Sequence, residues 1–196
     1  HLKKRLLLMV DSLDKYIICA ENVLSNEECD KILGEYADSS DWNTARVGLD
    51  SRIDTEIRNL SGVNVSQEDI ISKNFTIRKE IDEALFRASG NAIAAYLQTF
   101  ARCMVEEDTG YELLRYKTGE FYKEHVDSFK LKPRVVSCSF ALNDEYTGGE
   151  FAFFDSELKV RVNKGSAILF PSNFMYPHQI LPVTSGVRYS IVTWFK

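Results

Sequence analysis

Residues 116–127 read YKTGEFYKEHVD, and the end of this stretch places His125 two residues before Asp127. In an extended chain alternate side chains share a face, so the imidazole and the carboxylate point the same way. They can then occupy two adjacent coordination positions of one metal ion. The spacing suits a chelate, although a single His-x-Asp pair is weak evidence until a third ligand joins it.

The sequence around this pair has the period-two pattern of strands. We expect strands at Tyr111 to Tyr116, Phe121 to His125, Arg134 to Leu142, Glu150 to Phe153, Leu158 to Val162, Ser166 to Phe170, Tyr176 to Leu181 and Arg188 to Phe195. Turns rich in glycine and asparagine separate them. Short strands at this spacing predict a β-sandwich or a barrel.

Helical signals dominate the first hundred residues. Ser25 and Glu28 have the spacing of a capping box, and the apolar residues after them predict a helix of about ten to thirteen residues. Apolar residues at helical spacing between Phe75 and Arg102 predict a long second helix, which contains Gly90. We therefore expect an α+β chain with a mainly β core.

The segment from Asp41 to Gln67 separates the two helices and is rich in polar residues. It contains short strand-like pieces at Thr44 to Val47 and Glu56 to Leu60. Two interpretations stay open for the segment, a loop near the site or an ordinary surface excursion. For Arg58 we expect a surface position, with a place at the entrance of a site as the alternative.

Composition limits the class of protein. The 196 residues suit one domain, with 1–107 as helical support and a substrate-side segment and 108–196 as the core. A formal net charge of -5 argues against a nucleic-acid partner. The apolar run from Leu6 to Val10 is too short for a signal sequence or a membrane span, so no membrane association is expected.

Four cysteines are scattered without a Cys-x-x-Cys pair. This excludes a zinc ribbon and a dithiol redox motif, and it favours free thiols in a reducing cytoplasm over a disulfide framework.

His178 is the candidate for the third metal ligand. A lone histidine is more often a surface or core residue than a ligand. Two imidazoles and one carboxylate, however, form the facial triad of non-haem Fe(II) oxygenases, which leaves positions open for a bidentate oxo-acid and O₂. His125, Asp127 and His178 together are a stronger signal than any of them alone.

Arg188 lies on the final predicted strand, with Ser190, Val192 and Trp194 on the same face. A buried cation needs an anionic partner, because an unpaired buried charge costs several kcal/mol. A guanidinium matches a carboxylate with two parallel hydrogen bonds, so a bound dicarboxylic acid would satisfy Arg188. The alternative is an internal Asp or Glu.

Tyr116 has two interpretations as well. Its phenol could donate a hydrogen bond to the carboxylate that Arg188 holds, although a tyrosine at a strand end more often only packs.

The stretch from Tyr111 to the C-terminus resembles the catalytic core of the prolyl-4-hydroxylase-like 2-oxoglutarate/Fe(II) dioxygenases. The segment YKTGEFYKEHVD resembles their Y-x-x-G-x-x-Y-x-x-H-x-D, and 148–151 (GGEF) resembles their G-G-E-x-x-F turn. Residues 164–167, 176–178, 182–183 and 186–188 continue the pattern in the family's order.

The resemblance implies a role for each candidate residue. His125, Asp127 and His178 would ligate Fe(II). Arg188 would hold the distal carboxylate of 2-oxoglutarate with help from Tyr116 and Ser190, and Trp194 would form a wall of the pocket.

Two further positions qualify the resemblance. Related halogenases carry a small residue at the position of Asp127, so this aspartate favours hydroxylation. Oxygen-sensing members carry a second tyrosine that reaches 2-oxoglutarate, and Ala141 stands in its place here.

The implied fold is a double-stranded β-helix of the jelly-roll or cupin type, with the N-terminal helices packed on the larger sheet. The implied enzyme is a dioxygenase that uses Fe(II), 2-oxoglutarate and O₂, with ascorbate as an optional reductant, to hydroxylate a prolyl residue of a peptide or protein. The alternatives are a hydroxylase of free amino acids or other small molecules, and a non-catalytic β-barrel binding module.

Overall fold

The computed structural model describes residues 13–47, 52–66 and 75–196. The apolar run from Leu6 to Val10 lies outside these residues, as do parts of the segment from Asp41 to Gln67. Within the described ranges, no helix is both long enough and apolar enough to cross a membrane.

The larger of two main sheets has seven antiparallel strands. Their order is β1 (Ile18–Ala20), β11 (Ala167–Pro171), β7 (Val136–Ala141), β14 (Arg188–Phe195), β5 (Glu112–Tyr116), β4 (Ser61–Asn64) and β2 (Asn43–Thr44). β14 lies at the centre and pairs with β5 on one side and β7 on the other. Residues 188–195 therefore run through the middle of the sheet.

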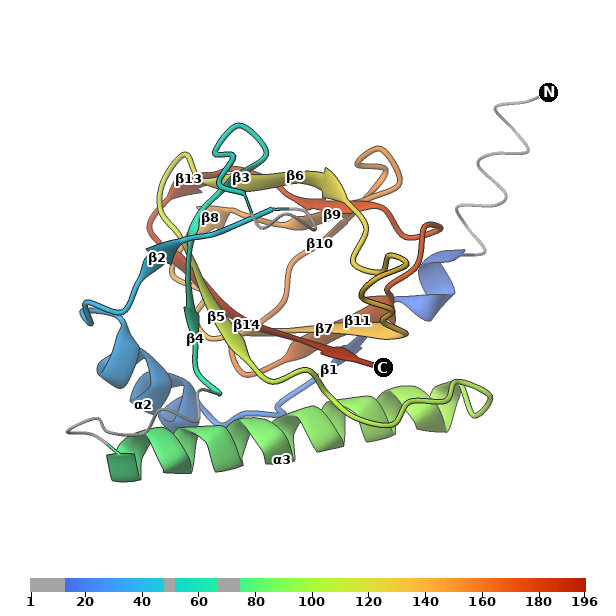
Figure 1. Cartoon of the computed structure of the whole chain (residues 1–196), viewed down its shortest axis with the longest axis horizontal. Coiled ribbons are helices and arrows are strands. Elements are labelled where there is room, and N and C mark those ends of the chain that lie inside the picture. The colour runs from blue at the N-terminus through green and yellow to red at the C-terminus, as the bar shows by residue number, and fades with distance from the viewer. Residues whose placement is uncertain (1–12, 48–51, 67–74) are drawn as a thin grey trace.

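The second main sheet has five strands and faces the first (Figure 1). Its order is β10 (Leu158–Val160), β9 (Phe151–Phe153), β12 (His178–Ile180), β6 (Phe121–His125) and β3 (Arg58–Asn59), and β13 (Val183–Ser185) pairs with β8 (Thr147–Gly148) beside it. Two facing antiparallel sheets of this kind make the double-stranded β-helix that the resemblance implies.

The helices cover the outer face of the larger sheet. A short 3-10 turn, η1 (Asp14–Tyr16), precedes β1, followed by α2 (Asn26–Tyr36) and α3 (Phe75–Thr99). The predicted capping box is present, since the Glu28 amide donates to the Ser25 hydroxyl and the Glu28 carboxylate accepts from the Ser25 amide. Figure 1 shows α3 running beneath the larger sheet, on the side away from the smaller one.

Two hydrophobic clusters hold these layers together. One joins the buried faces of α2 and α3 to the outer face of the larger sheet and includes Leu85 and Ile191. The other fills the space between the sheets and includes Phe153 and Phe170. Because residues alternate along β14, its odd positions face the helices and its even positions face the space between the sheets.

All eight strands expected from period two are present, mostly with shorter ends. β12 begins at His178 and not at Tyr176, because the Tyr176 amide closes a turn onto Asn173 and Pro177 has no N–H to donate.

Some elements differ from the expectation. The strand expected at Thr44 to Val47 is wrong in its bounds, since β2 is Asn43–Thr44 and Val47 forms only an isolated bridge with Arg52. The sequence missed β1, β4, β8 and β13, which have two to four residues each and are too short for an alternation to be recognised.

Replacing Leu85 with alanine should destabilise the fold by about 2–5 kcal/mol, because the side chain is fully buried between α3 and the larger sheet. Urea unfolding measures this loss. The matched control is Phe86→Ala, which truncates an exposed neighbour on the same helix and should change stability by at most about 0.5 kcal/mol. Equal losses in both variants would contradict the packing of α3 described above.

Candidate active site

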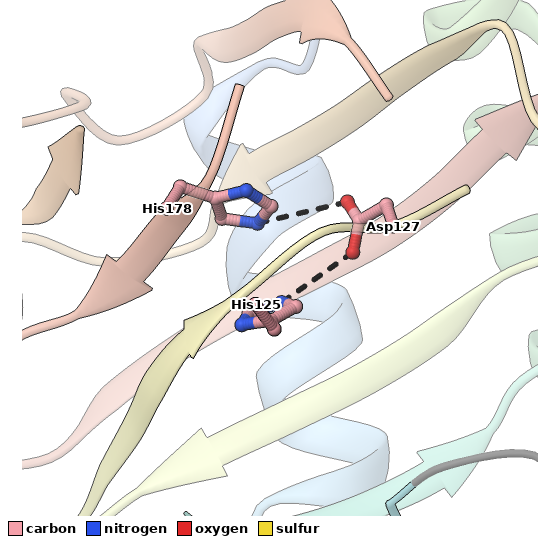
Figure 2. Close-up of side chains that lie close together, drawn as sticks. All are labelled: His125, Asp127 and His178. Atoms are coloured by element: carbon pink, nitrogen blue, oxygen red, sulfur yellow. Dashed lines mark ion pairs between the residues drawn. The ribbon is translucent and has the colours of Figure 1, made fainter. Parts of the chain in front are cut away.

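His125, Asp127 and His178 come together at the end of the smaller sheet (Figure 2). His125 on β6 and His178 on β12 are direct cross-strand partners, and Asp127 follows two residues after β6 ends. The Asp127 carboxylate lies 3.4 Å from His125 Nε2 and 3.6 Å from His178 Nε2. Each residue offers one ligand atom, and these atoms lie within 4.8 Å of one another.

Both imidazoles are oriented by their other ring nitrogen. The Nδ1 atom of His125 lies 2.8 Å from the Lys123 carbonyl, and that of His178 lies 3.2 Å from the Tyr176 carbonyl. A carbonyl accepts only, so each Nδ1 carries a proton, and in the neutral form of the ring Nε2 keeps a lone pair for a metal. Metal-binding histidines are held in this way, and the donor set therefore fits a divalent metal such as Fe(II).

The protonation states of Asp127 and His178 also suit the binding of a metal. Burial raises the pKa of Asp127, but attraction to His178 and His125 and a hydrogen bond from Ser137 outweigh it, so that the pKa is lowered well below its usual range. Burial, together with the neighbouring His125, lowers the pKa of His178 to about 4. At neutral pH the site therefore presents a carboxylate and a neutral His178 imidazole.

Ser137 fixes the carboxylate from the larger sheet. Its hydroxyl donates to Asp127 Oδ2 at 2.7 Å and also contacts the Ser172 hydroxyl at 2.8 Å. Ser137 is buried on β7 and has no pattern in the sequence that marks it as part of a site. It is a positioning residue that sequence reasoning missed.

Arg188 is buried at the far end of the same space, as its strand face predicts. Its Nη1 donates to the Ser190 hydroxyl at 2.9 Å, and its guanidinium lies 4.9 Å from the centre of the Tyr116 ring. Gly149 has φ +69°, and a Cβ there would come within 2.9 Å of the Arg188 side chain. The Gly148-Gly149 turn thus leaves the space that Arg188 needs.

No carboxylate among the described residues forms an ion pair with Arg188. Within that part of the chain, the alternative of an internal Asp or Glu partner is therefore wrong. A buried guanidinium without an anion is unfavourable, and a carboxylate entering from the pocket would pair with it. The Arg188 end of the pocket fits an acidic ligand.

A cavity of about 820 Å³ connects Arg188 to His125, Asp127 and His178. Tyr116, Ser190 and Trp194 all line it, as expected from their strand positions. Burial raises the pKa of Tyr116 to about 12, so its phenol is neutral at pH 7 and can donate a hydrogen bond. Ala141 lies opposite Ser190 on β7 and brings no hydroxyl to the cavity.

Tyr122 is a second residue whose place the sequence did not reveal. Period two puts it on the face opposite His125, but a β-bulge shifts the register between them, and the two rings stack with centroids 3.6 Å apart. Both line the cavity. A bulge of one residue leaves no trace in a hydrophobic pattern, so this contact could be found only in three dimensions.

The expected surface position of Arg58 is wrong. Its side chain is 12% exposed, lines the cavity and lies over the ring of Tyr122. Parts of the segment from Asp41 to Gln67 line the same cavity, which favours the interpretation of that segment as a loop near the site.

Comparison with known proteins agrees with this geometry. Residues 111–196 match the model of the 2OG-Fe(II) oxygenase superfamily. A PKHD-type hydroxylase of Maricaulis maris is 30% identical over 127 residues, which cover 62% of this chain and 53% of that protein. A PKHD-type hydroxylase of a Janthinobacterium species is 36% identical over 94 residues, covering 42% and 41%. The chain thus spans about half, or less, of the length of these relatives.

Solved structures share the fold at low identity. A prolyl hydroxylase of Trichoplax adhaerens, solved with a peptide of the hypoxia-inducible factor oxygen degradation domain, has a TM-score of 0.73 at 18% identity, covering 99% of this chain and 91% of that one. A prolyl-4-hydroxylase of Pseudomonas putida has a TM-score of 0.63 at 19% identity, covering 97% and 98%. These likenesses support the jelly-roll architecture.

Replacing Ser137 with alanine should weaken binding of Fe(II) or Mn²⁺ by about 10–100-fold, since the variant no longer orients the Asp127 carboxylate. Calorimetric titration of the metal measures the change. Ser139→Ala is the matched control, because Ser139 lines the cavity from the same strand but makes no hydrogen bond to Asp127 among the described residues. Unchanged metal affinity in Ser137→Ala would show that Ser137 does not position the ligand.

Proposed function

We propose that this chain, whose residues 111–196 match the model of the 2OG-Fe(II) oxygenase superfamily, is a dioxygenase that hydroxylates a prolyl residue of a peptide or protein. The reaction consumes 2-oxoglutarate and O₂ and releases succinate and CO₂. Bound Fe(II) supplies the redox chemistry that couples these changes to oxygen insertion at a C–H bond. The chain supplies the ligands, an anchor for the co-substrate and the walls of the pocket.

In this proposal His125, Asp127 and His178 hold the metal. The two carbonyls at Nδ1 leave both Nε2 atoms beside the Asp127 carboxylate, and Ser137 holds that carboxylate in place. Three protein ligands would leave coordination positions of the metal free for 2-oxoglutarate and O₂.

Arg188 anchors the distal carboxylate of 2-oxoglutarate. The Ser190 hydroxyl accepts a hydrogen bond from one N–H of the Arg188 guanidinium and so limits its rotation. The neutral Tyr116 phenol donates a hydrogen bond to the distal carboxylate of 2-oxoglutarate. Trp194 forms the wall of the pocket on the same strand face. The sequence position of Arg188, ten residues after the last metal ligand, brings anchor and metal into one cavity.

One observation supports this function above the others: the buried Arg188, which has no carboxylate partner among the described residues, shares a cavity with His125, Asp127 and His178. A metal site alone would suit many proteins, and a buried arginine alone would suit a structural ion pair. Their combination suits a dicarboxylate beside a metal. An intact triad and anchor also speak against the non-catalytic binding module.

The substrate, the type of reaction, the reductant and the location are proposed from similarity to other proteins and from composition. Prolyl hydroxylases among the structural neighbours favour a prolyl substrate, with a free amino acid or another small molecule as the alternative. Asp127 favours hydroxylation, and ascorbate is proposed as an optional reductant. The four cysteines are free, in keeping with the cytoplasmic location that we propose. The acidic net charge keeps nucleic acid outside the proposal.

The test is succinate formation with Fe(II), 2-oxoglutarate and O₂, screened over proline-containing peptides and free amino acids. The wild type should form succinate, and Asp127→Ala should form none that can be detected, because the metal loses its only anionic protein ligand. Wild-type protein that neither binds nor consumes 2-oxoglutarate with any substrate would refute the proposal.

A second variant tests the anchor separately. Arg188→Met keeps much of the side-chain volume but removes the charge, and it should raise the KM for 2-oxoglutarate by about 30-fold or more, since loss of a buried charge pair costs ~2 kcal/mol or more. Arg102→Met, which removes an exposed arginine outside the cavity, should leave this KM unchanged. A small KM change in Arg188→Met would place the co-substrate elsewhere.

A further inference from the structure

Among the described residues that line the cavity, cationic side chains outnumber carboxylates, although the chain is acidic. Among the described residues, its lining holds two carboxylates, Asp127 and Glu112, against five cationic side chains: Arg46, Arg58, Lys132, Arg134 and Arg188. This is an excess of three positive charges in a chain of net charge -5. Fe(II) and the 2-oxoglutarate dianion cancel each other's charge, so the excess persists when both are bound.

Two of these cations, Arg58 and Arg134, lie apart from the Arg188 anchor. In the ladder between β14 and β5, Arg188 faces Tyr116, whereas Glu112 faces Val192. The pair of Arg58 with Glu112 is therefore four residues farther along the strand, roughly 13 Å at strand spacing. Arg134 lies over the ring of Trp194, beyond Val192 on the same strand.

The guanidinium of Arg58 does not use all of its N–H donors among the described residues. Its Nη1 donates to the Arg46 carbonyl at 2.8 Å, but the Glu112 carboxylate is 3.7 Å from Nη2, too far for a hydrogen bond. Its Nε is buried and has no hydrogen-bond partner in the part of the chain that the structure describes. Glu112 itself packs over Gly62, where a Cβ would come within 2.8 Å of its carboxylate. Arg58 is thus held in the cavity, but only part of its hydrogen-bonding capacity is used.

Arg134 is also incompletely paired. Its Nη1 donates to the Asp127 carbonyl at 3.1 Å, and its guanidinium centre is 3.5 Å from the centre of the Trp194 ring. No carboxylate among the described residues forms an ion pair with it. Burial lowers the pKa of Arg134; Asp127 and Glu112 oppose this, and the positive charge of Arg58 adds to the lowering. Arg58 and Arg134 both line the cavity.

We propose that Arg58 and Arg134 bind a carboxylate of the substrate, so that the enzyme selects substrates that carry a negative charge near the carbon that reacts. This inference rests on the proposed function and names its substrate class. A carboxylate of the substrate would accept hydrogen bonds from N–H groups of Arg58 that Glu112 does not reach, and it would balance the positive charge of both side chains. The carboxylate can belong to a free amino acid or to an acidic side chain beside a proline in a peptide.

Two pairs of probes separate these sources. The first pair is L-proline and L-prolinamide, and the second is two short peptides with one proline flanked by glutamates or by glutamines. Binding is measured by calorimetry with Fe(II) and 2-oxoglutarate under anaerobic conditions, so that no turnover is needed. In at least one pair the carboxylate member should bind about tenfold more tightly or better, as expected for a charge-assisted hydrogen bond.

Variants then assign the preference to the cavity. Arg58→Met should abolish the difference within the pair, Arg58→Lys should retain part of it because the charge stays, and Lys159→Met should retain all of it because Lys159 is exposed on β10 outside the cavity. If Arg58→Met does not fold, the comparison of the wild type with Arg58→Lys still tests the inference. The preference for the carboxylate member should be present in the wild type and smaller in Arg58→Lys.

Equal binding of both members in both pairs, or a preference that survives in Arg58→Met, would overturn the inference. Failure of the proposed function looks different, because it appears as an absence of 2-oxoglutarate consumption by the wild type under aerobic conditions, whatever the probes bind.

Discussion

The guanidinium of Arg188 is a positive charge on the inner face of the central strand, and only 4% of the residue is exposed. A charge so buried must be balanced, and the described residues offer it a hydroxyl and two aromatic rings but no carboxylate. The rest of the site follows from this constraint. β14 fixes where the charge lies, Gly149 leaves space for it, and the cavity joins it to His125, Asp127 and His178. A dicarboxylate would pair with Arg188 at one end and ligate a metal held by His125, Asp127 and His178 at the other.

The parts of this site that sequence could predict are those that depend on regular geometry. Alternation along an extended chain correctly put His125 and Asp127 on one side, and it separated Arg188 and Trp194 from the helix-facing residues of β14. The capping box at Ser25 likewise predicted the start of α2, because its two hydrogen bonds are local. Such signals need only neighbouring residues, so one sequence suffices to find them.

The parts that could not be predicted depend on departures from regularity or on distant contacts. Tyr122 reaches His125 through a bulge, and Ser137 reaches Asp127 from another sheet. Arg58 looked like a surface residue because its environment is made by β5 and β6, far along the chain. Its neighbour Glu112 shows the same limit, since the pairing of the two depends on how β4 brings Gly62 beneath the carboxylate. Residues that orient or surround the site are therefore harder to predict from the sequence than the residues that form it.

We propose that one cavity holds a metal and 2-oxoglutarate together, with the oxo-acid as a ligand of the metal and its far carboxylate on Arg188. An anaerobic titration of the Fe(II)-loaded protein with 2-oxoglutarate, followed by visible absorption, tests it most directly. Chelation of Fe(II) by an α-oxo-acid gives a metal-to-ligand charge-transfer band. We expect this band to grow and saturate at one 2-oxoglutarate per chain. A folded, Fe(II)-loaded protein that shows no band at saturating 2-oxoglutarate would contradict the account.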